Sequence, residues 1–453
     1  MAPDTTLHVS YDENTPRRAS GRYWSTGEKF IFASTVALCW LGFSIWVSLP
    51  WVSDAAKVFT LFPALIVISL LAYIPGLLIA FLTVSLLIDR QPPLRVAHTS
   101  TPITILIAAR NEEAHIAETL RSLAAQDYEG PMVVVLIDNA STDGTVTAAR
   151  SIAGEIGCDV RILTETHLGK SFALNTGLDS VRTNLVITLD ADTLLHPSAL
   201  RLLVGRLESS PDDVCAVAGC VLVRNSRNSF WARIQEHDYF LGIASIKRMQ
   251  GLFQGTLVAQ GAFSLYRTDS VREVGGWPDA IGEDIVLTWR LMQNGARVYF
   301  EPLAVAFTSV PEHLGDFARQ RIRWARGMIE AVQFVPPWRQ RRAMAKVLTS
   351  IDLLIPLLDG AYILMWVPGV VLACFGIFWF VGPMTIAVLP LSLVVYGLLY
   401  RYQLKRVFEP LGMHVRHNVA GFLLFLIVYQ TFMSAFSIAG YAQEFVGARH
   451  HWK

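Results

Sequence analysis

The sequence contains few charged residues. Of its 453 residues only 17% are charged, against about 25% in ordinary soluble proteins, while 53% are hydrophobic and the mean hydropathy is positive. The net charge is +1, so no basic surface for nucleic acid is indicated, and we expect no nucleic-acid partner. This balance predicts instead that a lipid bilayer covers part of the protein.

Cysteine is also scarce, and its pattern excludes two classes of site. There is no C-x-x-C pair and no Cys/His cluster, so neither a zinc site nor a disulfide framework is indicated. The five cysteines suit small positions of a core or a membrane segment in a protein facing a reducing cytosol. They are Cys39, Cys158, Cys215, Cys220 and Cys374.

Long apolar runs are concentrated at both ends of the chain. Residues 30–52 and 58–88 carry no charge, and each run exceeds the roughly 20 residues that cross a hydrocarbon core. A cleaved signal peptide is the alternative for the first run, but no A-x-A site follows it and a second run comes at once. Residues 347–400 are long enough for two more spans, with a turn near Gly382-Pro383, and residues 418–442 predict the last one.

Basic residues beside these runs predict their orientation. With two spans before the centre of the chain and about three transmembrane or interfacial helices after it, every basic cluster can lie in the cytosol. The clusters are Arg17, Arg18, Arg22 and Lys29; Arg90 and Arg95; Arg339, Arg341, Arg342 and Lys346; and Arg401, Lys405, Arg406 and Arg416. We therefore predict a multi-pass protein of the cell (inner) membrane with a cytoplasmic central domain.

Five segments follow from these patterns. They are a polar N-terminal tail (1–28), two transmembrane helices (29–90), the cytoplasmic domain (100–343), about three transmembrane or interfacial helices (347–443) and a C-terminal tail (444–453). Within the third of the five predicted spans, Asp352 and Asp359 are unusual at membrane depth, where a carboxylate either contacts channel water or lies at the interface.

The central segment has the pattern of a soluble α/β domain. Short β-rich runs alternate with helical patterns, which is typical of a largely parallel sheet. The predicted helices include residues 113–125 and 143–156. The predicted strands are residues 103–108, 132–137, 161–163, 185–189 and 214–223.

Acidic residues stand where two of these strands end. Asp138 follows the second strand, and Asp190 follows the fourth and forms an Asp-x-Asp with Asp192. The carboxyl ends of strands are where α/β sheets bind ligands, and two alternating carboxylates can hold a hard divalent cation that also binds a diphosphate. Turn and capping acids occupy similar positions, so this pattern leaves both interpretations open.

A nucleoside triphosphatase is the alternative raised by Gly169-Lys170-Ser171, which resembles the end of a P-loop. That motif requires a glycine where Thr164 stands, so the phosphate cradle is missing. Lys170 can still contact a phosphate, or it can be a solvated loop lysine.

Two acids open a predicted helix downstream. Glu283 and Asp284 follow Gly282 at the start of residues 285–293. Acids in a first helical turn are frequently caps favoured by the helix dipole. On this motif alone, capping is the simpler interpretation.

A later helix presents a polar face. Gln320, Arg323 and Trp324 are spaced i, i+3, i+4 and share that face. Arginine can bind a phosphate through two hydrogen bonds, and an indole can pack on a sugar ring. The alternative is a basic amphipathic helix lying on the membrane, which would use Arg319, Arg321, Arg323 and Arg326. Both interpretations can hold at once, because such a helix has more than one face.

Taken in order, these motifs resemble the processive family 2 glycosyltransferases of GT-A type, which include the cellulose, chitin, hyaluronan and poly-N-acetylglucosamine synthases. The resemblance covers roughly residues 100–340, and the phrases Gly282–Arg290 and Tyr299–Pro302 are most similar to the bacterial poly-N-acetylglucosamine synthases. The motifs are Asp138, Lys170, Asp190-Ala-Asp192, Gly282-Glu283-Asp284 and Gln320-Arg-Ile-Arg323-Trp324. One departure is Gly282, since several members have threonine there.

The resemblance implies a role for each residue. Asp284 would be the general base and Asp138 would bind uracil. Asp190 and Asp192 would bind Mg²⁺ or Mn²⁺ and through it the UDP diphosphate. The remaining donor-site residues would be Lys170, Gln320 and Arg323, and the acceptor would contact Trp324 and Glu283.

The implied reaction is inverting transfer from a UDP-sugar to a growing polysaccharide that is exported across the membrane. The donor that the resemblance implies is UDP-N-acetylglucosamine. A small membrane accessory subunit is a candidate partner. One alternative is another β-linked polymer of the glucan, hyaluronan or chitin type. A second is a non-processive lipid-phosphate sugar transferase, against which the Gln-x-x-Arg-Trp face argues. A third, an inactive translocation subunit, would be expected to lose Asp284 or the Asp-x-Asp.

Overall fold

The computed structural model describes residues 24–89, 91–92, 94–96, 98–157, 159–382, 388–415 and 417–447. The predicted N-terminal tail up to residue 23, the turn after Gly382 and the last six residues of the C-terminal tail lie outside the described residues. So do Cys158, Arg90 and Arg416.

An eight-stranded mixed sheet forms the centre of the domain, in the order β3-β2-β1-β4-β7-β6-β8-β5. Strands β1 to β4 run parallel, and β7 lies antiparallel between β4 and β6. The strands are β1 (Ile103–Ala109), β2 (Met132–Asp138), β3 (Val160–Thr164), β4 (Leu185–Leu189), β5 (Leu194–Leu195), β6 (Val214–Val223), β7 (Phe263–Arg267) and β8 (Arg297–Thr308). The five predicted strands are therefore confirmed, whereas β5, β7 and β8 are not evident from the sequence pattern.

Continuous apolar runs explain the central strands. All five residues of β4 are buried, as are six of the seven in β1, which is typical of strands covered on both faces. Helix α6 packs against β1 and β2, and α7 packs against β6 and β8. The helices around the sheet are α4 (Ile116–Ala124), α5 (Thr145–Ile156), α6 (Lys170–Ser180), α7 (Ala199–Glu208), α10 (Thr268–Glu273) and α11 (Glu283–Gln293).

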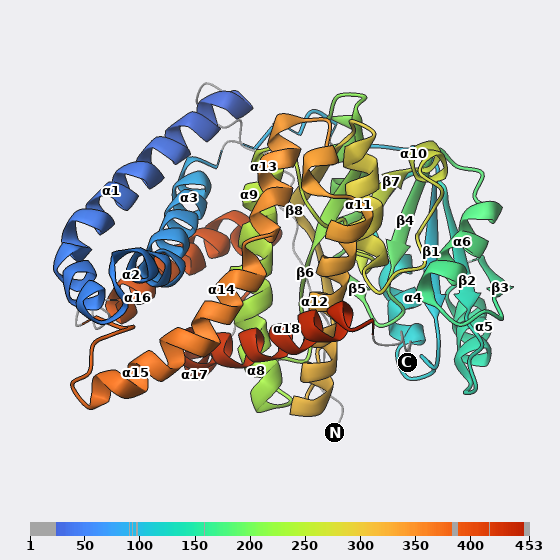
Figure 1. The fold of residues 1–453 in the computed structure, drawn as a ribbon. Coiled ribbons are helices and arrows are strands. Elements are labelled where there is room, and N and C mark those ends of the chain that lie inside the picture. The colour runs from blue at the N-terminus through green and yellow to red at the C-terminus, as the bar shows by residue number, and fades with distance from the viewer. Residues whose placement is uncertain are drawn as a thin grey trace.

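A layer of helices, made of one continuous helical stretch (residues 230–252) and of α12, separates the sheet from the apolar helices (Figure 1). It consists of α8 (Phe230–His237), a π-helical segment η2 (Asp238–Ile243), α9 (Ala244–Leu252) and α12 (Leu314–Phe334). Helix α9 packs against α3, α8 packs against α17, and α12 packs against α18. This layer carries the motif Gln320 to Trp324.

The apolar helices lie at the other end of the molecule from β1 to β3 (Figure 1). Helix α1 (Thr26–Phe59) begins with a capping box, in which Ser25 Oγ accepts from Glu28 N at 3.2 Å and Glu28 Oε2 accepts from Ser25 N at 2.6 Å. The other segments are α2 (Leu61–Ile68), η1 (Ser69–Tyr73), α3 (Ile74–Ile88), η3 (Pro337–Arg339), α13 (Ala343–Asp352), α14 (Ile355–Ala361), η4 (Tyr362–Trp366), α15 (Val367–Cys374), α16 (Val388–Gln403), η6 (Leu404–Phe408), η7 (Glu409–Leu411), α17 (Val419–Leu424), η8 (Phe425–Tyr429) and α18 (Gln430–Phe445).

Among the described residues, four helical stretches are long and apolar enough to cross a membrane, which indicates a membrane protein. They are Thr26–Phe59, Leu61–Ile88, Ala343–Cys374 and Val419–Phe445. Helix α16 continues directly into η6, but this stretch, residues 388–408, is not among the four. The number of spans and the side of each loop therefore stay predictions.

Buried ion pairs join the domain to the apolar helices. Arg248 Nη2 of α9 lies 2.8 Å from Asp89 Oδ2 at the end of α3, and Arg326 Nε of α12 lies 2.9 Å from Glu444 Oε2 of α18. A further carboxylate, Asp359, is buried between α14 and α18, where its two oxygens accept hydrogen bonds from Ser434 Oγ (2.6 Å) and Tyr441 Oη (2.8 Å). Helix packing therefore uses both oxygens of Asp359.

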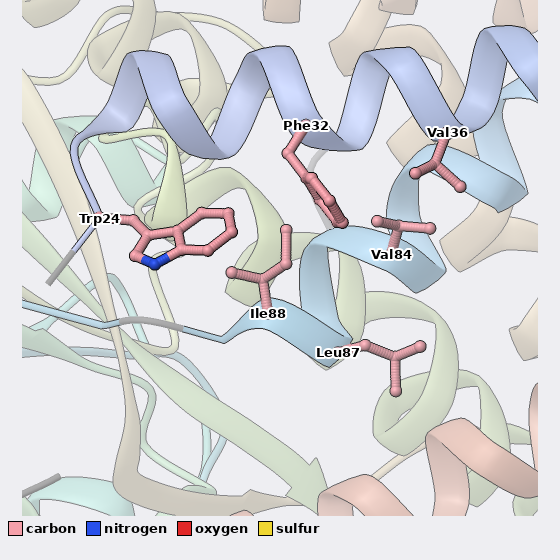
Figure 2. Close-up of a pocket in the computed structure, with 6 residues that line it drawn as sticks. All are labelled: Trp24, Phe32, Val36, Val84, Leu87 and Ile88. Atoms are coloured by element: carbon pink, nitrogen blue, oxygen red, sulfur yellow. The ribbon is translucent and has the colours of Figure 1, made fainter. Parts of the chain in front are cut away.

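An apolar groove of about 430 Å³ runs between α1 and α3 (Figure 2). It lies on helices that are candidate membrane spans, and none of the acidic residues predicted for the site lines it. Its lining residues are Trp24, Phe32, Val36, Val84, Leu87 and Ile88.

Candidate active site

The strand-end acids lie along one edge of the sheet. Strands β1, β2 and β4 are parallel and in register, so Asp138, which ends β2, and Asp190, which follows β4, stand at the same edge. Asp138 is buried, and its Oδ1 accepts a hydrogen bond from Ser141 N at 3.2 Å. The parallel register thus gathers two acids that are 52 positions apart in the sequence (190 − 138).

Asn139 is a site residue that the sequence does not single out. Its Nδ2 donates to Glu165 O (3.1 Å) and His167 O (2.7 Å), and its Oδ1 accepts from Gly169 N (2.8 Å). This fully buried side chain therefore shapes the loop that delivers Lys170 to the start of α6. An asparagine directly after a strand-end aspartate is the only signal that could have found it.

Lys170 connects two parts of the site. Its Nζ forms an ion pair with Asp190 and lies 3.8 Å from Glu283 Oε1. Burial alone would lower the pKa of Lys170, but the charges of Asp190 and Glu283 outweigh it and hold the pKa above its usual value. The alternative of a solvated loop lysine is therefore wrong.

Asp192 lies at the carboxyl end of β8. Its Oδ1 accepts from Thr308 Oγ1 and Thr193 Oγ1, each at 3.3 Å. Burial raises the pKa of Asp192, and repulsion by the charge of Asp190 raises it further. A bound cation would relieve this repulsion, so the Asp-x-Asp suits a metal.

The carboxylates by themselves would not enclose such an ion. Among the described residues no group of three or more His, Cys, Asp or Glu is arranged to hold a metal. Mg²⁺ in phosphate-binding sites commonly takes one or two carboxylates and completes its shell with water and substrate phosphates. Asp190 and Asp192 fit that incomplete arrangement.

Glu283 and Asp284 open α11 but do not serve merely as caps. Asp284 Oδ2 accepts from Gly261 N (3.1 Å), and its Oδ1 accepts from Ile285 N (2.8 Å). Burial and the charge of Asp284 raise the pKa of Glu283 to about 7, although Lys170 opposes the shift. The pair thus combines a carboxylate oriented by backbone donors with a neighbour that exchanges a proton near neutral pH.

Gly282 allows α11 and α12 to meet backbone to backbone. A Cβ at Gly282 would lie 2.7 Å from the Cα of Gly327, and Gly282 N donates to Glu330 Oε2 at 3.0 Å. A threonine side chain at this position would collide with α12. Gly282 and Gly327 therefore lie against each other where the two backbones meet, and a side chain at either position would collide with the other.

We expect Gly282→Ala to destabilise the protein by about 1–3 kcal/mol, since the added methyl group meets rigid backbone rather than a flexible side chain. The measurement is the Tm of the purified protein in detergent. Gly154→Ala is the matched control, because a Cβ there meets nothing within 4 Å. Equal Tm values for the two variants would contradict the tight contact between the helices.

Two arginines of α12 take no part in a basic face on the membrane surface. Arg321, only 1% exposed, pairs with Asp238 at 2.9 Å, and Arg326 pairs with Glu444. Both side chains point into the protein, so they do not face lipid headgroups. Arg319 and Arg323 are exposed, so a smaller basic face of this helix stays a prediction.

The remaining face of α12 carries Gln320, Arg323 and Trp324, of which Arg323 acts on the site. Trp324 is 36% exposed, and the guanidinium of Arg321 lies 4.2 Å from its ring centroid. The charge of Arg323 acts on Glu283. Gln320 Oε1 is buried and has no hydrogen-bond partner among the described residues. An indole supported from one side and an unsatisfied amide oxygen are features suited to a polar ligand.

Residues 101–327 match the model of the glycosyltransferase-like family 2. This segment makes up half of the chain, which therefore belongs to that family.

Two relatives are poly-β-1,6-N-acetyl-D-glucosamine synthases. The one from Staphylococcus aureus (strain COL) is 33% identical over 241 residues, which are 53% of this chain and 57% of the relative. The one from Staphylococcus epidermidis is 31% identical over 227 residues, which are 50% and 54%. The chain thus spans about half the length of the curated relatives it matches.

A similar solved structure is a mannosyltransferase from Pyrobaculum calidifontis in complex with GDP-Man and Mn²⁺. It has a TM-score of 0.53 and 18% identity, and the match covers 92% of this chain and 100% of that one. At this identity the likeness concerns the fold. The predicted α/β fold of GT-A type, flanked by apolar helices, is confirmed.

Proposed function

We propose that this protein is a membrane-embedded inverting β-glycosyltransferase that extends a polysaccharide from a UDP-sugar. The observation that carries the proposal is Lys170, whose ammonium pairs with Asp190 of the Asp-x-Asp and lies beside Glu283, next to Asp284. Lys170, which would bind the diphosphate, is thereby held close to the oriented carboxylate of Asp284. The similarity to poly-β-1,6-N-acetyl-D-glucosamine synthases supports UDP-N-acetylglucosamine as the donor.

In the proposed reaction Asp284 accepts the proton of the acceptor hydroxyl as that oxygen attacks the anomeric carbon. The bond from the anomeric carbon to the phosphate oxygen breaks, and negative charge develops on the departing UDP. Lys170 and Arg323 stabilise this charge electrostatically. Asp190 and Asp192 would hold Mg²⁺ or Mn²⁺, which supplies further charge stabilisation when bound. Asp138 would contact the uracil at the edge of the sheet.

The acceptor would lie against Trp324 and Glu283, on the side of the site that faces the apolar helices. Because α12 packs on α18, a chain leaving Trp324 would enter the layer of candidate spans. We propose that these helices export the product, with the domain in the cytoplasm and the protein in the cell membrane. A small accessory subunit is a further proposed partner.

The experiment supplies purified protein in nanodiscs with labelled UDP-sugars one at a time and digests the product with linkage-specific glycosidases. Incorporation of N-acetylglucosamine into a polymer that a β-1,6-specific glycosidase degrades is the expected result. A polymer of another sugar would reassign the donor. Transfer of a single sugar to a lipid phosphate would overturn the proposal that the protein is a polymerase.

Trp324→Ala should shorten the product while UDP affinity changes little. A polymerase must hold the acceptor end while UDP leaves, and stacking on an indole contributes of order 1 kcal/mol beyond the area it buries. The measurement is product length and donor turnover in nanodiscs. Trp338→Ala is the control, because that tryptophan is 67% exposed on η3. If Trp324→Ala made a product of wild-type length at the wild-type rate, Trp324 would have no role in holding the acceptor.

A further inference from the structure

Lys247 of α9 is a buried cation to which the proposed mechanism gives no role. Its side chain is 8% exposed, and its Nζ donates to Val258 O at 3.1 Å and to Gln260 Oε1. Burying an ammonium is costly unless it is hydrogen-bonded and compensated by charge. Both acceptors belong to the loop of residues 258–261, which passes beside Asp284.

That loop is held by side chains at successive positions. Ala259 N donates to Thr288 Oγ1 (2.9 Å), whose hydroxyl in turn donates to the main-chain oxygen of Asp284 (2.7 Å). Tyr266 Oη donates to Ala259 O (2.7 Å). The loop ends at Gly261, whose N–H donates to Asp284 Oδ2 at 3.1 Å. Lys247 therefore acts on the orientation of Asp284 through one short piece of backbone.

Gly261 cannot take another residue without disturbing this arrangement. A Cβ there would lie 2.7 Å from Lys170 Nζ and 3.7 Å from Glu283 Oε1. The loop is thus packed between the donor-side lysine and the acidic pair. A small displacement of residues 258–261 would move Gly261 N relative to the carboxylate it orients.

Titratable groups face Asp284 from four elements. Lys170, Glu283 and Tyr266 face it from α6, its own helix and β7, and Lys247 faces it from α9. Burial lowers the pKa of Lys247 to about 8, while the charge of Asp284 opposes the shift. At neutral pH most of the Lys247 side chains therefore carry a proton.

We propose that Lys247 is a positioning residue for the general base. Its ammonium fixes residues 258–261 so that the N–H of Gly261 orients the Asp284 carboxylate. This inference rests on the proposed function, because it assigns Lys247 to the proton-transfer step of the same site.

The test compares Lys247→Met and Lys247→Arg in the full-length protein in nanodiscs, with UDP-N-acetylglucosamine as donor. For Lys247→Met we expect kcat to fall about 10- to 100-fold, because a shift of about 1 Å in a catalytic group has that effect. KM for the donor should stay within about twofold, since the interaction acts on the chemical step.

Lys247→Arg keeps a cation and its donors, so it should recover most of kcat. The matched control is Lys346→Met, the same change at an exposed lysine of α13. UDP affinity, measured separately, reports whether each variant is folded. Wild-type kcat for Lys247→Met would overturn the inference alone. So would equal losses of kcat in the Met and Arg variants, or a donor KM that changes as much as kcat, since a merely structural lysine predicts those results. A wild-type protein that transfers no sugar would overturn the proposed function, and this inference with it.

Discussion

Asp284→Asn should leave UDP binding near the wild-type value and reduce sugar transfer by about 10²- to 10⁴-fold, the range expected when a general base is lost. Asparagine occupies nearly the same volume, and its amide oxygen can still accept one of the two backbone donors, Gly261 N and Ile285 N. It cannot take the proton of the acceptor hydroxyl. The loss should therefore fall on the chemical step and leave the fold intact.

The measurement is the initial rate of sugar incorporation, together with UDP affinity in the same preparation. Asp269→Asn is the matched control, because this carboxylate is 95% exposed on α10 and should tolerate the change. A purified Asp284→Asn protein that bound UDP and kept more than about a tenth of the wild-type rate would show that another group removes the proton.

Removal of the divalent cation should abolish transfer, and Asp192→Ala should do nearly the same at ordinary metal concentrations. Burial and repulsion by the charge of Asp190 raise the pKa of Asp192. A cation shared with the diphosphate would turn this repulsion into binding energy. Alanine at position 192 removes one of the two proposed protein ligands, so both UDP affinity and rate should fall.

The measurements are sugar incorporation in EDTA with Mg²⁺ or Mn²⁺ added back, and UDP affinity with and without metal. Asp212→Ala, at an exposed position before β6, is the control. Metal should strengthen UDP binding in the wild type and in this control, and much less in Asp192→Ala. Full activity of the wild type in chelator would show that the Asp-x-Asp holds no metal needed for transfer and only forms a turn.

The sequence predicts those parts of the fold that depend on local pattern. Strands β1 and β4 are continuous apolar runs followed by polar turns, so both their position and the location of Asp190 follow from the pattern. Strand β8 is harder to predict, because Pro302 lies inside it and its pairing with β6 includes irregularities of register. Strand β7 has five residues and pairs antiparallel with β4, a partner some 75 residues earlier in the chain.

The contacts that assemble the site could not be predicted in the same way. The ion pair of Lys170 with Asp190, the three hydrogen bonds of Asn139 and the approach of Gly282 to Gly327 each join segments at least 20 residues apart. Sequence spacing identifies residue types that suit a role. Their distances depend on how the sheet and the helices pack, and a buried lysine such as Lys247 has no local signature.

The contact between Gly282 and Gly327 has a consequence for how a polymer would grow. One helix carries Asp284, the proposed proton acceptor, and the other carries Trp324, the proposed support of the terminal sugar, and the two backbones touch with no side chain between them. The two helices are therefore expected to move as one body, which would keep the distance between Asp284 and the Trp324 ring constant. After each addition the product, rather than the protein, would then have to advance by one sugar before the next hydroxyl reached Asp284.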